Sequence, residues 1–538
     1  MATIDQPKAG AREWVGLGVL SLAALVYVMD LTVLDLAVPA ISRDLRPSST
    51  QLLWIIDIYG FVVAGFLVTM GAVGDRVGRR RLLLVGAGAF GLTSILSAIS
   101  VTPEMLIGAR ALLGIAGATI APSTLSLIFN MFQNPGERAR AIAIWISAFS
   151  AGSAIGPMIG GLLLEHFWWG SVFLIALPVM GLLLILGPIV LPEYRDPNAG
   201  RLDLVSALMS LVAVLAVVFG VKQIAQDGLS LLSVVSIVIG VLVGGLWVRR
   251  QLASDDPMID LRLFRIPAFN ASLVVNFLTI FVAVGYFLFV AQYLQLVVGL
   301  SPLVAGLCSV PSALGFIVGS NLAPPLVRRM RAADVMGASL IVATLGLVLL
   351  TQVGVSNSLA IVIVSSVVIA LGLAPVLTLT TDLVVGSAPP ERAGAASGVS
   401  ETAVELGGAL GISVLGSLGV AIYRGELASL PVGLSSEATT TAKDTLGGAV
   451  KVAALLPDSL GLTVLELARS AFVQAMQVAA SISAVVAIVV AIFAVVTLRR
   501  VSPSAEEAAE EAKPITETDC FGRTRGCVPA AVSETQAA

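Results

Sequence analysis

The chain has 538 residues, a net charge of −3, and a composition that is 57% hydrophobic and only 12% charged, with a mean hydropathy of +0.98. Soluble globular proteins carry about 45–50% apolar and about 25% charged residues, so these values exclude a soluble enzyme and a disordered protein. Aromatic residues make up 6% of the chain, and the charge is not basic, which argues against a nucleic-acid partner. The composition predicts a membrane protein.

Fourteen apolar runs follow one another along the chain, separated by charges or by Gly and Pro turns. Each has about the length of a helix that crosses ~30 Å of hydrocarbon. The first run is too long and too acidic for a cleaved signal peptide, so we expect it to stay in the protein. The expected spans are 14–40, 51–71, 82–101, 104–128, 139–164, 169–191, 203–223, 229–249, 268–298, 303–326, 335–354, 357–381, 393–423 and 470–498.

The distribution of Lys and Arg predicts the orientation, because positive loops are retained on the cytoplasmic side. The N-terminus, the loops after even-numbered spans and the C-terminal tail hold 23 of the 31 basic residues, and the opposite loops hold 7. We therefore expect both termini in the cytoplasm and the chain in the plasma membrane. The 5 lysines against 26 arginines indicate a bacterium with a GC-rich genome.

A weak internal repeat predicts the domain organisation. An Arg-rich turn follows the second span (Arg76 to Arg81), and another follows the tenth (Arg328 to Arg331). Equivalent turns of this kind are typical of transporters built from parallel repeats. The expected parts are a cytoplasmic N-terminus (1–13), a six-helix bundle (14–191), two inserted helices (203–249), a second six-helix bundle (268–498) with a long external loop (424–469) that is partly helical or mobile, and an acidic, disordered tail (499–538).

Three stretches combine small residues with charges that are costly in a membrane. Residues 71–81 read GAVGDRVGRRR, Arg110 lies inside the fourth span, and residues 152–161 read GSAIGPMIGG. An intramembrane arginine indicates a functional site by default, whereas the Gly/Pro cluster is also explained by close helix packing alone. The motif residues are Gly71, Asp75, Arg76, Gly78, Arg79, Arg80, Arg110, Gly152, Gly156, Pro157, Gly160 and Gly161.

In these three stretches the chain resembles the major facilitator superfamily. The fourteen spans and the segments at 52–66, 110–129 and 254–264 resemble its drug:proton antiporter family 2, and within it exporters of the QacA and SmvA type. The resemblance covers about residues 14–500. It implies the major facilitator fold, an all-α membrane protein of two six-helix bundles plus two inserted helices.

Five acids lie in the interior of the apolar spans, away from their ends: Asp30, Asp35, Asp57, Glu401 and Glu405. A carboxylate is costly in hydrocarbon unless it is neutralised, hydrated or paired, which is what a proton carrier requires. Glu401 and Glu405 are four residues apart and share a helix face, whereas Asp30 and Asp35 point about 140° apart.

The resemblance implies proton or substrate coupling for these acids and for Arg110. Asp30, Asp57, Glu401 and Glu405 match acidic positions of QacA-type exporters, but many relatives have Asn where this chain has Asp35. Phe316 stands where those pumps carry an acid in the tenth helix. Because of that difference, export of divalent cations is less expected. Monovalent cations and lipophilic compounds remain the expected substrates.

Aromatic side chains are candidates for a substrate cavity, since they bind lipophilic cations by dispersion and cation–π contact. The candidates are Tyr27, Trp54, Tyr59, Trp145, Tyr286, Phe289 and Tyr293. We expect no metal site, because His166 is the only histidine and Cys520 and Cys527 lack further ligands nearby. No phosphate-binding loop is present either.

The expected function is proton-coupled multidrug efflux by alternating access, without enzymatic activity and without a cofactor. The expected partners are small lipophilic or cationic substrates, protons and the lipid bilayer, and we expect a monomer. Two alternatives remain: a dedicated exporter of one metabolite or antibiotic, and a receptor or lipid-handling protein that kept the fold without transport.

Overall fold

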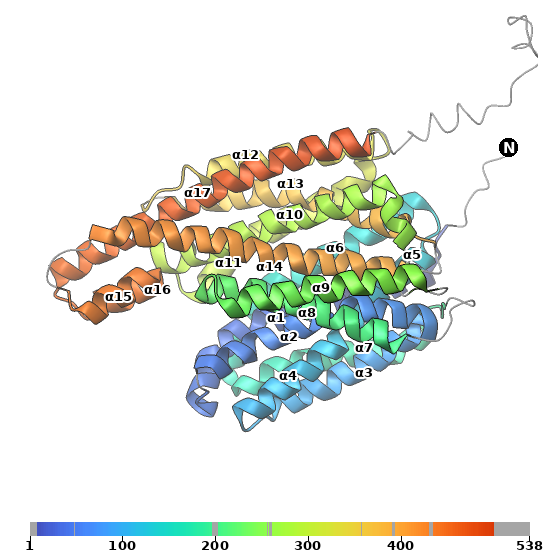
Figure 1. Cartoon of the computed structure of the whole chain (residues 1–538), viewed down its shortest axis with the longest axis horizontal. Helices are drawn as coiled ribbons and strands as arrows, with labels where there is room; N and C mark the ends of the chain where they lie inside the picture. The colour runs from blue at the N-terminus through green and yellow to red at the C-terminus, as the bar shows by residue number, and fades with distance from the viewer. Residues whose placement is uncertain are drawn as a thin grey trace, which may run out of the picture.

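The computed structural model describes residues 8–47, 49–195, 203–254, 257, 261–356, 358–389, 393–429 and 434–499, which form helices and turns without strands (Figure 1). The side chains of Asp35, Asp57 and Pro157 lie outside this description, as does the predicted disordered tail from residue 500 onward. The backbones of these three residues belong to described helices.

The helices follow the order of the expected spans. The first group is α1 (Ala11–Leu45), α2 (Ser49–Val77), α3 (Arg79–Ala98), α4 (Pro103–Gly117), α5 (Ile120–Met131), α6 (Pro135–His166) and α7 (Ala176–Val190). Next come α8 (Leu204–Asp227) and α9 (Leu231–Ala253). The last group is α10 (Pro267–Gln292), α11 (Pro302–Leu326), α12 (Ala332–Leu350), α13 (Leu359–Gly386), α14 (Ala393–Glu426), α15 (Ser436–Asp444), α16 (Leu446–Ala453) and α17 (Asp458–Leu498).

Within the described residues, thirteen helical segments are long and apolar enough to span a membrane. The helices α4 and α5 together form one of them, at the expected fourth span. Helix α8 occupies the expected seventh span and adds a shorter apolar stretch, Val205–Val221. The structure therefore agrees with the predicted all-α membrane fold.

The last helix begins at Asp458, twelve residues before the predicted start at 470. Its first turns pack against α16, where a side chain at Gly461 would lie 2.5 Å from the carbonyl oxygen of Ala453. Val464 and Ala468 are fully buried there. Tertiary packing on the two short helices of the 424–469 segment thus extends α17 beyond its apolar run.

Buried apolar side chains form two main clusters. One is built mainly from residues 17–191, and the other from residues 271–498. The pairs α2 with α14 and α6 with α11 pack across the boundary between the clusters. We call this boundary the seam.

Helices α8 and α9 pack on each other and lie between the two groups of helices (Figure 1). Helix α8 contacts both α2 and α14, whereas α9 is mostly exposed, as expected of a helix that faces lipid. Asp203 caps α8 and accepts a 2.8 Å hydrogen bond from Arg250 of α9. Hydrogen bonds from Arg250 and Ser206 hold the pKa of Asp203 well below its usual range.

Candidate functional site

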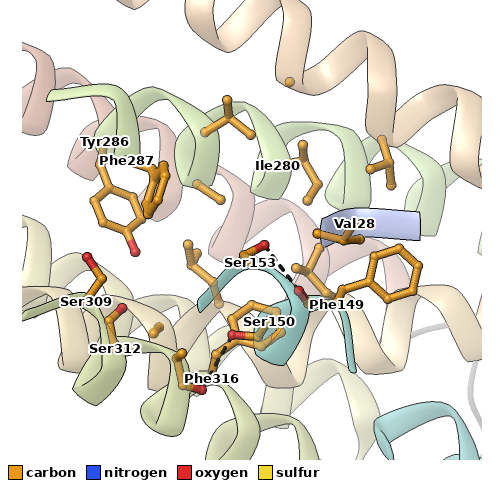
Figure 2. Close-up of a pocket in the computed structure, with 18 of the residues that line it drawn as sticks. Val28, Phe149, Ser150, Ser153, Ile280, Tyr286, Phe287, Ser309, Ser312 and Phe316 are labelled. Carbon is orange, nitrogen blue, oxygen red and sulfur yellow. Dashed lines mark hydrogen bonds between the residues drawn. The ribbon is translucent and has the colours of Figure 1, made fainter. Parts of the chain in front are cut away.

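A cavity of about 660 Å³ lies at the seam, within the range of drug-sized ligand pockets. Residues of α1, α2, α6, α8, α10, α11, α13 and α14 line it. Most of its wall is apolar, with Phe149, Ile280, Phe287 and Phe316 among the lining side chains (Figure 2). Such a wall binds lipophilic molecules without demanding one exact polar geometry.

Glu401 and Glu405 bring two carboxyl groups into this wall from adjacent turns of α14. Glu401 is only 8% exposed. The neighbouring face of α14 carries Gly407 and Gly411, which pack against backbone carbonyls of α10; a side chain at either would lie 2.5 Å from a carbonyl oxygen. Close packing of this glycine face orients α14 so that its acidic face meets the cavity.

Asp30 and Arg110 form a buried ion pair behind the wall. Arg110 Nη1 lies 2.7 Å from Asp30 Oδ2, and the arginine side chain is not exposed. Arg110 also donates to the carbonyl oxygens of Ile55 (3.0 Å) and Ile56 (3.5 Å), and its guanidinium lies 5.0 Å from the ring centre of Tyr59. Because Ile56 lines the cavity, the pair joins α1, α2 and α4 one layer behind it.

Asp75 connects α2 to the first turn of α14 across the seam. Its Oδ1 accepts the backbone N–H of Gly394 (3.1 Å), and its Oδ2 accepts that of Ala395 (2.9 Å). Arg79 also donates to Oδ1, at 2.8 and 2.9 Å, and both side chains are buried. A carboxylate at a helix N-terminus satisfies free N–H groups and complements the helix dipole.

The remaining residues of this motif shape the turn after α2. Gly78 adopts φ +114°, which an L side chain rarely tolerates, between α2 and α3. Gly71 lies so close to the carbonyl oxygen of Gly394 that no side chain fits there. Two arginines of the motif bind backbone carbonyls near this turn. Arg76 donates to the carbonyl oxygen of Ala72. Arg80 donates to the carbonyl oxygens of Pro188 and Leu191, at 3.3 and 3.1 Å.

Two further polar contacts cross the seam on the side of Asp75. Arg138, near the start of α6, forms a 2.9 Å ion pair with Asp382, near the end of α13. The hydroxyls of Ser147 and Ser320 are hydrogen-bonded at 2.7 Å between α6 and α11. We call these contacts, together with that of Asp75, the Asp75-side latch.

The glycines of the 152–161 stretch pack α6 onto α1. A side chain at Gly152 would lie 2.5 Å from the carbonyl oxygen of Leu25, Gly156 faces Thr32, and Gly160 faces Val33. Gly161 has open space beside it. Close helix packing, the alternative named above, is therefore sufficient to explain three of these glycines.

Of the seven candidate aromatic residues, Trp145 and Tyr286 line the cavity. The other five are not among its lining residues and make contacts elsewhere. Tyr59 donates to the carbonyl oxygen of Tyr27 (3.4 Å), Trp54 packs on Phe61, Phe289 packs on Phe472, and Tyr293 donates to the carbonyl oxygen of Gly354 (2.8 Å).

Polar residues that sequence reasoning missed also line the cavity: Ser150, Ser153, Asn276, Ser309, Ser312 and Ser366. Serine is common in membrane helices because its hydroxyl bonds to backbone carbonyls. Its presence in a span therefore carries little signal.

Comparisons with known proteins agree with this architecture. Residues 20–412 match the model of the Major Facilitator Superfamily. The chain is 44% identical to the multidrug efflux pump LfrA of Mycolicibacterium smegmatis, over 93% of this chain and 99% of that protein. It is 36% identical to the methyl viologen resistance protein SmvA of Salmonella typhimurium, over 87% and 95%. It is 32% identical to the tetracenomycin C resistance and export protein of Streptomyces glaucescens, over 93% and 94%.

The human organic anion transporter MFSD10 has a similar fold, with a TM-score of 0.55 and 17% identity over 88% of this chain and 99% of that one. The residues matched by the family model and the identity to these relatives together show that the chain belongs to the major facilitator superfamily, a family of membrane transporters and not of enzymes.

Proposed function

We propose that the chain is a proton-coupled exporter of lipophilic and cationic compounds that works by alternating access across the plasma membrane. The observation that carries the proposal is the apolar cavity at the seam with two carboxyl groups in its wall. Lipophilic bodies bind to its aromatic and aliphatic lining, and a positive charge is attracted by the carboxylates and by the ring of Trp145. The names of the relatives, a multidrug efflux pump and a methyl viologen resistance protein, support this substrate class.

Proton coupling arises because a proton and a substrate cation bind to the same carboxylate in turn. Glu405 binds a proton or a substrate cation, and its neighbour Glu401 disfavours a state in which both are ionised. Asp57 is a third exchange site in this proposal, on sequence grounds alone. Each proton that enters down about 100 mV supplies about 2.3 kcal/mol, so two protons sustain roughly a thousandfold gradient of a neutral substrate.

The proposed moving parts are the bundles 14–191 and 268–498, with the inserted helices 203–249 beside the seam. The two apolar clusters support this division. The bias of basic residues, 23 against 7, supports cytoplasmic termini, which places the Asp75-side latch at the cytoplasmic face. With the latch formed, the cavity faces outward. The transporter acts as a monomer, because one chain supplies both walls of the cavity at the seam.

Breaking the latch is expected to shift the transporter away from the outward-facing state. Asp75→Asn removes a charge that accepts backbone N–H groups of α14, a loss of about 1–2 kcal/mol. The ratio of outward- to inward-facing molecules should therefore fall by a factor of about 5–30. Cys308 lines the cavity and reports this change. In a Cys520→Ser, Cys527→Ser background, a membrane-impermeant maleimide added outside should label it more slowly in the variant.

The matched control is Glu165→Gln, which neutralises an exposed acid near the end of α6. It should leave the labelling rate unchanged. Equal labelling in Asp75→Asn and the parent would show that the latch does not hold the outward state.

Ethidium uptake into energised everted vesicles tests the function itself. We expect uptake that stops when a protonophore removes the gradient. If well-expressed protein moves neither ethidium nor any other cationic dye but does move one natural product, the chain is a dedicated exporter. If ligands bind without proton release and nothing is transported, the non-transport alternative holds.

A further inference from the structure

A group of hydroxyls forms a second polar region of the cavity wall, distinct from the carboxylates of α14. It comprises Tyr286 of α10, Ser309 and Ser312 of α11, and Ser366 of α13, and we call it the hydroxyl cluster. Figure 2 shows the hydroxyl of Tyr286 pointing toward Ser309 and Ser312. Three helices therefore contribute hydroxyls to one part of an otherwise apolar wall.

The hydrogen bonds of the hydroxyl cluster leave oxygen lone pairs for a ligand. Ser309 donates to the carbonyl oxygen of Ala305 (3.2 Å), and Ser312 donates to that of Ser366 (3.2 Å). A serine hydroxyl has one proton and two lone pairs, so a serine that donates to a backbone carbonyl still accepts.

Ser366 provides an independent sign that this region is incomplete without a ligand. Its side chain is 93% buried, since only 7% of its surface is exposed, and its hydroxyl has no hydrogen-bond partner. In the other polar region, beside the carboxylates, Oδ1 of Asn276 also has no partner; this cavity residue is 1% exposed, and its amide nitrogen donates to Ser400, next to Glu401. Buried polar atoms are rarely left unpaired, because each costs about 1–3 kcal/mol.

The two polar regions lie far apart along the cavity. Helices α10 and α14 run in the same direction, since Gly407 packs on Phe277 and Gly411 packs on Phe281. Asn276 therefore lies level with the acidic turns of α14. Tyr286 follows ten residues later, about 15 Å further along the axis at about 1.5 Å per residue.

We propose that the hydroxyl cluster is a second substrate subsite, which binds a hydroxyl or carbonyl group located about 10–15 Å from the positive charge that the carboxylates bind. The substrates of this subsite are elongated amphiphiles with a cationic end, an apolar middle and a neutral polar far end. The inference rests on the proposed function and specifies its substrates. Ile280, Phe287 and Phe316 line the cavity with these two regions and contact the apolar middle.

A matched pair of cations tests the subsite: decyl triphenylphosphonium and its ω-hydroxydecyl analogue, which have equal charge and differ by one terminal hydroxyl. We define the hydroxyl preference as kcat/KM for the hydroxylated cation divided by kcat/KM for the other, measured by uptake into everted vesicles. Tyr286→Phe and Ser366→Ala should each lower it about 3- to 10-fold, the value of one hydrogen bond. Transport of the plain decyl cation should change less than about twofold, because this cation has no terminal hydroxyl and makes no hydrogen bond to the cluster that the variants could remove.

Ser94→Ala is the matched control. Ser94 is also a fully buried serine whose hydroxyl has no partner, but it lies in α3, outside the cavity wall. Because Ser366 has no partner for its hydroxyl, Ser366→Ala breaks no bond of that hydroxyl and keeps the fold. Equilibrium binding of both cations to purified protein gives the same ratio without turnover.

The outcomes are separable. A lower hydroxyl preference in both cavity variants, with Ser94→Ala unchanged, supports the subsite. An unchanged preference in both variants, or an equal change in the control, overturns the subsite while export of the decyl cation upholds the proposed function. If the wild type transports neither cation, the proposed function fails and the subsite with it.

Discussion

Glu405→Gln is expected to lower proton-driven export of monovalent cations about 10- to 100-fold while the protein stays folded. Glutamine has nearly the same shape as glutamate but cannot release a proton or attract a cation as a carboxylate does. Hydrogen bonds and contacts to a charged group are worth about 1.5–3 kcal/mol, which sets this range. The measurement is the initial rate of ethidium uptake into everted vesicles at matched expression.

Glu401→Gln should act in the same direction with a smaller effect, because Glu401 tunes or shares the exchange at its neighbour. The control is Glu437→Gln, which neutralises an exposed acid of α15, outside the cavity. A second readout is proton release when a cation binds to purified protein, which Glu405→Gln should reduce. Normal uptake and normal proton release in a well-expressed Glu405→Gln variant would exclude this residue as the exchange site.

Arg110→Gln is expected to cause the largest loss of stability among single substitutions at this site. It leaves the Asp30 carboxylate buried without its charged partner, and removing one member of a buried pair costs about 3–5 kcal/mol. It also removes the donors to Ile55 and Ile56. The measurement is the midpoint of thermal unfolding in detergent, which should fall sharply relative to wild type.

The double variant Asp30→Asn, Arg110→Gln separates structure from coupling. It contains no uncompensated charge, so most of the stability should return. Arg110→Lys should recover less of the lost stability than the double variant does, because one ammonium group cannot reproduce the planar guanidinium that reaches Asp30 and two backbone carbonyls. If the stable double variant exports ethidium like wild type, the pair serves the fold and does not couple protonation to the conformational change.

The sequence alone determined the features that depend on residues close together in the chain. The lengths of the apolar runs predicted the helices, and the period of the α-helix placed Glu401 and Glu405 on one face, which the structure turns toward the cavity. The small and charged residues at 71–81 indicated a tight turn, and Gly78 adopts the positive φ that such a turn requires. Local periodicity and backbone sterics are sufficient for these inferences.

Features that depend on how distant helices pack were decided only by the tertiary structure. Asp30 meets Arg110 across 80 residues, and Asp75 caps α14 from more than 300 residues away. Among the aromatic candidates, Trp145 and Tyr286 face the cavity whereas Tyr59 and Phe289 are covered by other helices. Every face of a membrane helix is apolar enough to meet lipid, another helix or a cavity, so its sequence does not reveal which of these it meets.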